Sequence, residues 1–405
     1  MENPPLCAKC AQRFFAVGKP RASNAGKGAA PPSIGITGDG GGCFICQGSL
    51  SALPSLVEAA LSQSDSFEWE TFSVSSSFSR AMLLREAEVA TQLLPGQCTS
   101  LKNSVNSEIA EKIAKAAGKK NDQRSADASF EFDFTAKKAT ARPMQLYVHG
   151  HYIKLARGFC QSRWHCSECG GKGAGAQAAG GGKGEACPSC SGSGMNYPSV
   201  EDEIGKALMA AFCAQGCTLH ASGREDVDVR CLGNGRPFVM ELAAPKRRAA
   251  DLRALERGFG KNGNVRAIGL RFVHKGFIDS VCNSHFEKEY EAIVSADRAL
   301  TASDAKKVAA LSGTALSQHT PTRVLARRSD MLRTRTVYKI SAEAIDGGKL
   351  RLRILAEAGT YIKEFIHSDA GRTKPSVSSA LSCRAACDSL DVVAIRDYFL
   401  ETVKD

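Results

Sequence analysis

The sequence of 405 residues lacks any run of about 18 apolar residues, so we expect no segment that spans a membrane. Its start, Met-Glu-Asn-Pro-Pro-Leu-Cys, has neither a basic stretch nor an apolar run, and a secretory signal is not expected. Acidic residues are in deficit, with 42 Asp and Glu against 53 Lys and Arg, and the formal net charge is +11. A basic chain tends to associate with polyanions, which favours nucleic acid as a partner, although the same charge could serve solubility alone.

Cysteine, by contrast, is abundant, with 16 residues. Without a secretory signal the thiols are expected in a reducing compartment, the cytoplasm or the nucleus. Paired cysteines there bind metal more often than they form disulfides.

Eight of the cysteines form four CxxC pairs, which fall into two sets. Each set offers four thiolates to one tetrahedral ion and leaves no open position, so the pattern predicts two structural zinc sites. Free or redox-active thiols are the alternative interpretation. The ligands of the first set are Cys7, Cys10, Cys43 and Cys46, and those of the second are Cys166, Cys169, Cys187 and Cys190.

Periodicity predicts short strands mixed with helices. Residues 101–117 carry apolar side chains at a helical spacing, whereas apolar and acidic residues alternate over 130–134 as in a half-buried strand. Ser199, with Asp202 three residues later, predicts a helix start. Asp346-Gly347-Gly348 predicts a hairpin between strands at 337–345 and 350–355. Regular βαβ alternation is missing, which favours an α+β fold with a mixed or antiparallel sheet.

Composition divides the chain into four predicted segments, because Gly-rich spacers lie between the members of each cysteine set. They are an N-terminal zinc module at 1–50, an α/β domain at 51–160, a second zinc-binding insertion at 161–198 and a larger α+β domain at 199–405.

The most informative motif is Ser-Gly-Arg-Glu-Asp-Val-Asp-Val-Arg at 222–230, followed by Leu-Gly-Asn-Gly-Arg-Pro-Phe at 232–238. On charge alone it could be a solvated loop with local ion pairs. That interpretation does not explain Gly223, Gly233 and Gly235, which suggest a close approach of the backbone to something else.

This motif resembles the Pus-ten family of tRNA pseudouridine synthases of archaea and eukaryotes. Further blocks resemble the family in the same order: PMQLYVHGHYIKLARG at 143–158, KEYEAIV around Tyr290, SQHTPTRVLARR at 317–328 and AGTYIKEFIHSDAGRTKPS at 358–376. The resemblance implies a pseudouridine synthase catalytic fold over 199–405. It also implies that 51–160 belongs to a THUMP-containing RNA-binding domain.

The resemblance also implies roles for single residues. Asp226 matches the essential catalytic Asp, and Asp228 is its neighbour in the motif. Tyr290 matches the ring that packs on the target base, Ile362 an apolar residue of the pocket wall, and Lys363 the basic partner of the Asp. Arg224 is a second candidate cation, and Leu390 is a pocket candidate placed by its spacing.

The expected reaction isomerises a uridine of the tRNA T-arm, at position 55, position 54 or both, and needs no organic cofactor. A carboxylate such as Asp226 can act as the nucleophile, and the target base must leave its stack to reach it. Basic side chains would bind the tRNA backbone. The candidates are Arg323, Arg327, Arg328, Arg333 and Arg335 in one cluster and Lys246, Arg247 and Arg248 in another.

Two alternative functions, neither of them an enzyme activity, stay open beside the synthase. The first is a non-catalytic tRNA-binding or folding factor that uses the THUMP-like domain and the basic clusters alone. The second is a chaperone, because CSECGGKG at 166–173 and CPSCSGSG at 187–194 resemble the CxxCxGxG repeats of DnaJ-type proteins. No motif indicates a protein partner, so a monomer is the expectation.

Overall fold

The computed structural model describes residues 4–15, 36–37, 42–93, 99–174, 186–260, 263–326 and 328–400. The chain forms two compact units, of which the first comprises Met1–Gln145 with Ala243–Ala249 and the second Leu146–Leu242 with Ala250–Asp405. Residues 146–160 lie in the second unit, and the described buried cysteines and apolar residues between Leu6 and Leu50 belong to the hydrophobic core of the first. No described helix has the length and apolar character that crossing a membrane requires.

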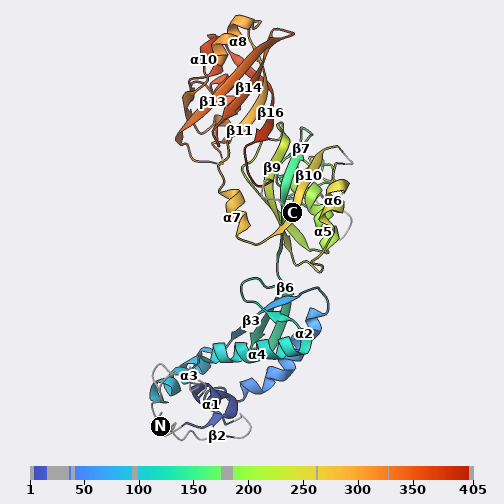
Figure 1. Ribbon diagram of the computed structural model, residues 1–405, viewed down its shortest axis with the longest axis vertical. Helices are drawn as coiled ribbons and strands as arrows, with labels where there is room; N and C mark the ends of the chain where they lie inside the picture. Colours follow the sequence, from blue (N-terminus) through green and yellow to red (C-terminus); the bar gives the residue numbers. More distant parts are fainter. Residues whose placement is uncertain are drawn as a thin grey trace. The chain divides into compact units, whose positions relative to one another are not determined.

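The first unit is a four-stranded sheet, in the order β4-β3-β5-β6, covered by helices. In Figure 1 the long helices α2 and α4 run alongside this sheet, and they contact β6 and β3 respectively. Its elements are β1 (Leu6–Cys7), α1 (Ala8–Phe15), β2 (Ile36–Thr37), α2 (Leu53–Ser64), β3 (Thr71–Ser77), α3 (Arg80–Leu93), α4 (Leu101–Ala117), β4 (Lys120–Asn121), β5 (Ala128–Asp133) and β6 (Lys138–Pro143).

The second unit is built on one large sheet in the order β10-β7-β9-β16-β11-β14-β13-β12-β15, with β8 paired to β9. Its strands are β7 (Leu146–Lys154), β8 (Gly216–Ala221), β9 (Arg230–Ala243), β10 (Val265–Val273), β11 (Lys288–Ala296), β12 (Thr314–His319), β13 (Leu332–Ile345), β14 (Lys349–Ala356), β15 (Thr373–Lys374) and β16 (Ala385–Ile395). Its helices are α5 (Val200–Phe212), α6 (Leu252–Gly258), α7 (Phe277–Cys282), α8 (Ala302–Ala309), α9 (Ile362–His367) and α10 (Val377–Leu381), with a 3-10 turn, η3, at Thr322–Val324.

One short parallel contact joins the two halves of this sheet. β9 pairs with β16 only through Asp391 with Arg230 and Val392 with Cys231, whereas every other pairing in the described part of this path is antiparallel. In Figure 1 the strands β7, β9 and β10 lie with α5 and α6, and β11, β13, β14 and β16 lie with α8 and α10. The fold is therefore α+β with a mixed, mainly antiparallel sheet, as the sequence predicts.

The predicted local elements are confirmed. α4 spans 101–117 and buries Val105, Ile109 and Ile113, and β5 alternates between buried and half-buried side chains. The Ser199 hydroxyl accepts a hydrogen bond from the Asp202 amide at the start of α5. β13 and β14 form the predicted hairpin.

The glycines of the Asp226 motif approach neighbouring strands. A Cβ at Gly233 would lie 2.0 Å from the Val393 carbonyl oxygen, and one at Gly235 would lie 2.7 Å from the Tyr152 carbonyl oxygen. Both glycines have positive φ. These positions therefore let β9 pass between β7 and β16, which explains the close backbone approach that the sequence suggested.

Candidate active site and metal centres

Asp226 lies in the loop between β8 and β9, and each of its carboxylate oxygens faces a different cation. Arg323 Nη1 donates to Oδ1 at 2.9 Å, and Lys363 Nζ lies 3.3 Å from Oδ2. The Asp226 side chain keeps 36% of its surface exposed, so a bound substrate can reach it. These cations come from η3 and α9, about 100 and 140 residues further along the chain.

Each cation is shared with a second acid. Lys363 Nζ lies 2.7 Å from both oxygens of Asp228, and Arg323 Nε donates to Glu364 Oε1 at 2.8 Å. Partial burial is the largest single influence on the pKa of Asp228 and raises it, but the hydrogen bond and charge of Lys363 and the charge of Arg323 together bring this pKa below its ordinary value. Asp228 is therefore held as an anion, as a partner of Lys363.

A buried polar network fixes the loop that carries Asp226. The Glu225 carboxylate is fully buried and pairs with Arg236, whose Nε donates at 2.8 Å. The Tyr152 hydroxyl donates to the same carboxylate at 2.8 Å, and Arg236 Nη1 donates to the Ser222 carbonyl oxygen. Glu225 therefore points inward into this network, and Asp226, the next residue, remains partly exposed.

A buried lysine caps the backbone of the same loop. Lys154 Nζ donates to the carbonyl oxygens of Phe159, Asp226 and Val227 at 2.7, 3.0 and 3.4 Å. Burial lowers the pKa of Lys154, and the nearby Glu225 carboxylate opposes that shift. The three carbonyl acceptors use all three donors of the ammonium group, so the loop backbone at Asp226 is held directly.

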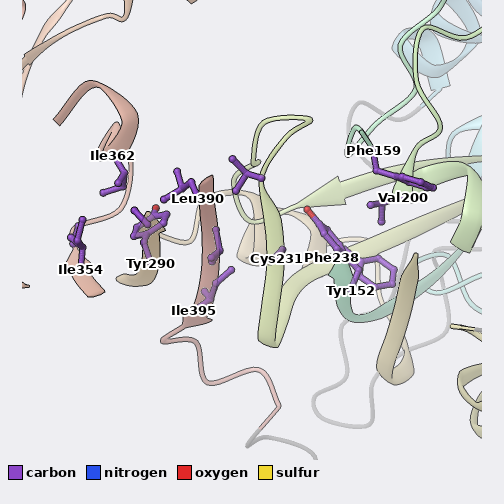
Figure 2. Packing of buried hydrophobic residues seen from close by; sticks show 14 of the residues in the cluster. Tyr152, Phe159, Val200, Cys231, Phe238, Tyr290, Ile354, Ile362, Leu390 and Ile395 are labelled. Carbon is purple, nitrogen blue, oxygen red and sulfur yellow. The ribbon is translucent and has the colours of Figure 1, made fainter. Parts of the chain in front are cut away.

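The predicted pocket residues lie together in the core of the second unit. Figure 2 shows Tyr290 of β11 between Ile354 and Ile362 on one side and Leu390 of β16 on the other. All four are buried, and burial raises the pKa of the Tyr290 hydroxyl to about 12. Because Ile362 directly precedes Lys363 at the start of α9, the apolar group and the ion pairs at Asp226 are adjacent along the chain.

Arg157 joins the Asp226 loop to the strand of Leu390. Its Nη1 donates to the carbonyl oxygens of Asp228 and Leu390 at 2.6 and 2.9 Å, and its Nη2 lies 2.7 Å from Asp391. Sequence reasoning did not single out this residue, nor Lys154, Glu225 or Glu364. Lys154 and Arg157 both belong to the block at 143–158 that carries the family resemblance, and that block was the available signal.

The two basic clusters expected to bind RNA lie in different units, the arginines at 323–335 in the second and the residues at 246–248 in the first. Arg328 contacts the Tyr361 hydroxyl, Arg333 the Thr320 hydroxyl and Arg335 the Glu357 carboxylate, while Arg327 lies outside the described residues. In the first unit Lys246 and Arg247 are exposed, and Arg248 pairs with Asp127.

Arg224 is exposed, and it forms no ion pair with any residue that the structure describes. Arg323, which the sequence suggested only for RNA binding, is instead the second cation on Asp226.

Both sets of cysteines form compact groups that could hold a metal ion. Within each group the four sulfur atoms all lie within 4.8 Å of one another, and all four cysteines are buried and free of disulfides. Four converging thiols suit a tetrahedral ion. The first group, Cys7, Cys10, Cys43 and Cys46, is part of the hydrophobic core of the first unit.

The second group, Cys166, Cys169, Cys187 and Cys190, is a small cluster separate from the main core. The backbone amides of Gly173 and Gly194 donate to the sulfurs of Cys169 and Cys190 at 3.3 and 3.2 Å. Such donors stabilise thiolates, which are the form that binds metal. A Cβ at Gly173 would lie 2.4 Å from the Gly192 carbonyl oxygen, so the two CxxC loops pack closely through glycine.

The chain is similar to known proteins over most of its length. It is 34% identical to a protein of Korarchaeum cryptofilum named tRNA pseudouridine synthase Pus10. The match covers 89% of this chain and 94% of the relative. It is 32% identical to proteins with the same name from Methanothrix thermoacetophila, over 89% of this chain and 78% of the relative, and from Halorubrum lacusprofundi, over 96% and 93%.

Among solved structures, a Cbf5-Nop10-Gar1 complex is similar over 47% of this chain and 44% of that one, with 19% identity and a TM-score of 0.29. The family model described as Pus10, C-terminal, matches residues 147–396, which contain Asp226 and all the side chains that surround it. The chain therefore belongs to the Pus10 family.

Proposed function

We propose that this protein is a tRNA pseudouridine synthase, in which Asp226 attacks a uridine of the T-arm. One observation carries the proposal: Asp226 is a partly exposed carboxylate with a separate cation on each oxygen, within the segment that the Pus10 family model matches. The names of the curated relatives support the substrate class and the reaction.

The chemistry requires an ionised carboxylate and no redox step. The N-glycosidic bond of the uridine breaks, the uracil rotates, and the bond re-forms to carbon 5, so the product is an isomer. Arg323 and Lys363 each lie on one oxygen of Asp226, and their positive charges complement a carboxylate nucleophile. The reaction adds and removes no group, so the proposal includes no organic cofactor.

The base must leave its stack before it can react. Tyr290, Ile362 and Leu390 would form the apolar side of the pocket that receives it, and the ring of Tyr290 would pack on the uracil. The arginines near the site, Arg328, Arg333 and Arg335, would bind backbone phosphates. The first unit, which supplies Lys246 and Arg247, would act as a THUMP-containing RNA-binding domain.

Zinc is the metal that we propose for both cysteine groups, because an all-thiolate set without an open position is typical of structural zinc. It would stabilise the fold and take no part in the reaction.

The test is an in vitro reaction with an unmodified tRNA transcript, in which pseudouridine is mapped chemically. We expect product at position 55, position 54 or both with the wild-type protein, and none with Asp226→Asn. Asp228→Asn is the matched control, because it removes the charge of the neighbouring acid on the same lysine, and it should retain product formation. Wild-type protein that binds the tRNA without forming product would favour a non-catalytic tRNA-binding factor.

A further inference from the structure

The charged side chains at Asp226 form a chain of alternating sign. Asp226 lies between Arg323 and Lys363, Arg323 continues to Glu364, and Lys363 continues to Asp228. The two outer acids differ in environment. Asp228 is mostly exposed, whereas the side chain of Glu364 is only 2% exposed.

Glu364 depends on Arg323 for its charge balance. Its Oε1 accepts the hydrogen bond from Arg323 Nε, and its Oε2 has no hydrogen-bond partner within the described part of the chain. A buried carboxylate is costly unless a cation compensates it. Burial lowers the pKa of Arg323, but Glu364 and Asp226 together raise it above its usual range, so this guanidinium stays charged.

The guanidinium geometry links the two acids. Arg323 presents Nε to Glu364 and Nη1 to Asp226, and these donors belong to one planar group. Once Nε is fixed on Glu364, the direction of Nη1 is restricted. Separate contacts hold the backbone at this point, because the amide of Thr322 donates to Asp369 at 2.9 Å. Glu364 therefore orients the Arg323 side chain. It is not needed to hold the backbone at this position.

This orientation matters because the arginine is accessible. Arg323 is 40% exposed, and a guanidinium near an RNA backbone readily forms a bidentate pair with phosphate. The buried carboxylate of Glu364, on the other side of the guanidinium, opposes the exchange of Asp226 for a phosphate group.

We propose that Glu364 is a positioning residue that holds Arg323 on Asp226 when the tRNA binds, so that the Asp keeps both cations during the chemical step. This inference rests on the proposed function, since it assumes that Asp226 is the reacting group. It predicts that Glu364 acts on the rate through Arg323, and that Arg323 is not a phosphate contact.

A double-mutant cycle tests the inference in the full-length protein, with single-turnover rates at saturating tRNA transcript. Arg323→Met should slow the reaction about 100-fold, the typical loss when one preorganised donor is removed. Glu364→Gln keeps an acceptor but loses the charge, and it should slow the reaction about tenfold. The double variant should be only as slow as Arg323→Met, because Glu364 has no effect without its partner.

Two further variants separate positioning from general damage. Arg323→Lys keeps the charge on an exposed side chain but cannot bridge both acids, so it should be slow and still fold. Asp304→Asn is the control for stability, since Asp304 pairs with Arg298 at 2.7 Å and caps α8. It should lower the melting temperature and leave the rate unchanged.

Binding gives a readout that does not depend on the rate. The affinity for tRNA and its salt dependence should be unchanged in Arg323→Met, whereas the loss of a phosphate contact would reduce the salt slope by about 1. Three results would each overturn the inference while the proposed function stands. They are a reduced salt slope of tRNA binding in Arg323→Met, a double variant whose rate loss is the product of the two single losses, and a wild-type rate in Glu364→Gln. Wild-type protein that makes no pseudouridine would overturn both.

Discussion

At the scale of single residues, buried polar groups determine the shape of the Asp226 loop. Glu225 is buried and paired with Arg236, and Lys154 donates to the carbonyl oxygens of Phe159, Asp226 and Val227. Polar groups in a low-dielectric interior interact strongly, and they also cost most when a partner is lost. This loop should therefore be rigid before substrate binds.

Lys154→Met tests that rigidity. The substitution leaves the buried carbonyls of the loop without a donor, so we expect the free energy of unfolding to fall by about 2–4 kcal/mol. We also expect a lower single-turnover rate at unchanged tRNA affinity, because Asp226 loses the group that holds its backbone. Chemical denaturation and a rapid-quench assay measure the two effects.

Lys288 is the matched control for this substitution. It is also buried, with a pKa that burial lowers to about 8, but among the described residues its ammonium donates only to the carbonyl oxygen of Phe286. Lys288→Met should cost less stability, about 1 kcal/mol, because fewer acceptors are left unpaired. Equal losses in the two variants would mean that the loop does not depend on Lys154 in particular.

At the scale of elements, the sequence predicts what is local. Apolar spacing gave α4 and β5, the Ser199–Asp202 pair gave the start of α5, and a Gly-rich turn gave the β13–β14 hairpin. These features depend on a few neighbouring residues, for which periodicity and capping rules hold.

Local sequence patterns do not predict which distant segments of the chain pair with each other. No periodicity indicates that β9 contacts β16, or that Arg323 lies on Asp226 rather than in an exposed basic cluster. Family resemblance pointed to Lys363, and the structure brings it to 3.3 Å from Asp226. It assigned no role to Glu364, whose contact with Arg323 joins side chains 41 residues apart in the sequence.

The close approach of the paired strands β9 and β16 leads to a prediction at this scale. A Cβ at Gly233 would meet the Val393 carbonyl oxygen at 2.0 Å, and φ there is +59°, so Gly233→Ala must separate the strands. We expect a loss of about 3 kcal/mol or more in stability and a reduced rate, because the pairing joins the half with Asp226 to the half with Lys363. Denaturation and single-turnover assays measure both quantities.

Gly313→Ala provides the comparison, since Gly313 has a similar φ of +76° and no heavy atom of the described residues lies within 4 Å of an added Cβ. It should cost only about 1 kcal/mol, the strain of an L residue in the left-handed region. If the two variants lose the same stability, the close approach at Gly233 is not what limits substitution there.

At the scale of the whole molecule, the two cysteine groups have different relations to the cores around them. The first group shares one hydrophobic core with α2, α4 and β5, so the sulfurs and the apolar side chains form a continuous interior. The second group is a cluster of four cysteines outside the main core of its unit. Loss of metal from the first group should therefore destabilise its unit more than loss of metal from the second group destabilises the other unit.

We expect about two zinc ions per chain by elemental analysis, and about one in each of Cys10→Ser and Cys169→Ser. Cys10→Ser should make the first unit sensitive to proteolysis and weaken tRNA binding, because its core contains the metal site. Cys169→Ser should keep the second unit folded and retain a single-turnover rate close to that of the wild type, since that core is separate from the cysteines. Equal proteolytic sensitivity in both variants would show that the second site also supports its unit. Wild-type protein without bound metal would instead contradict the zinc assignment.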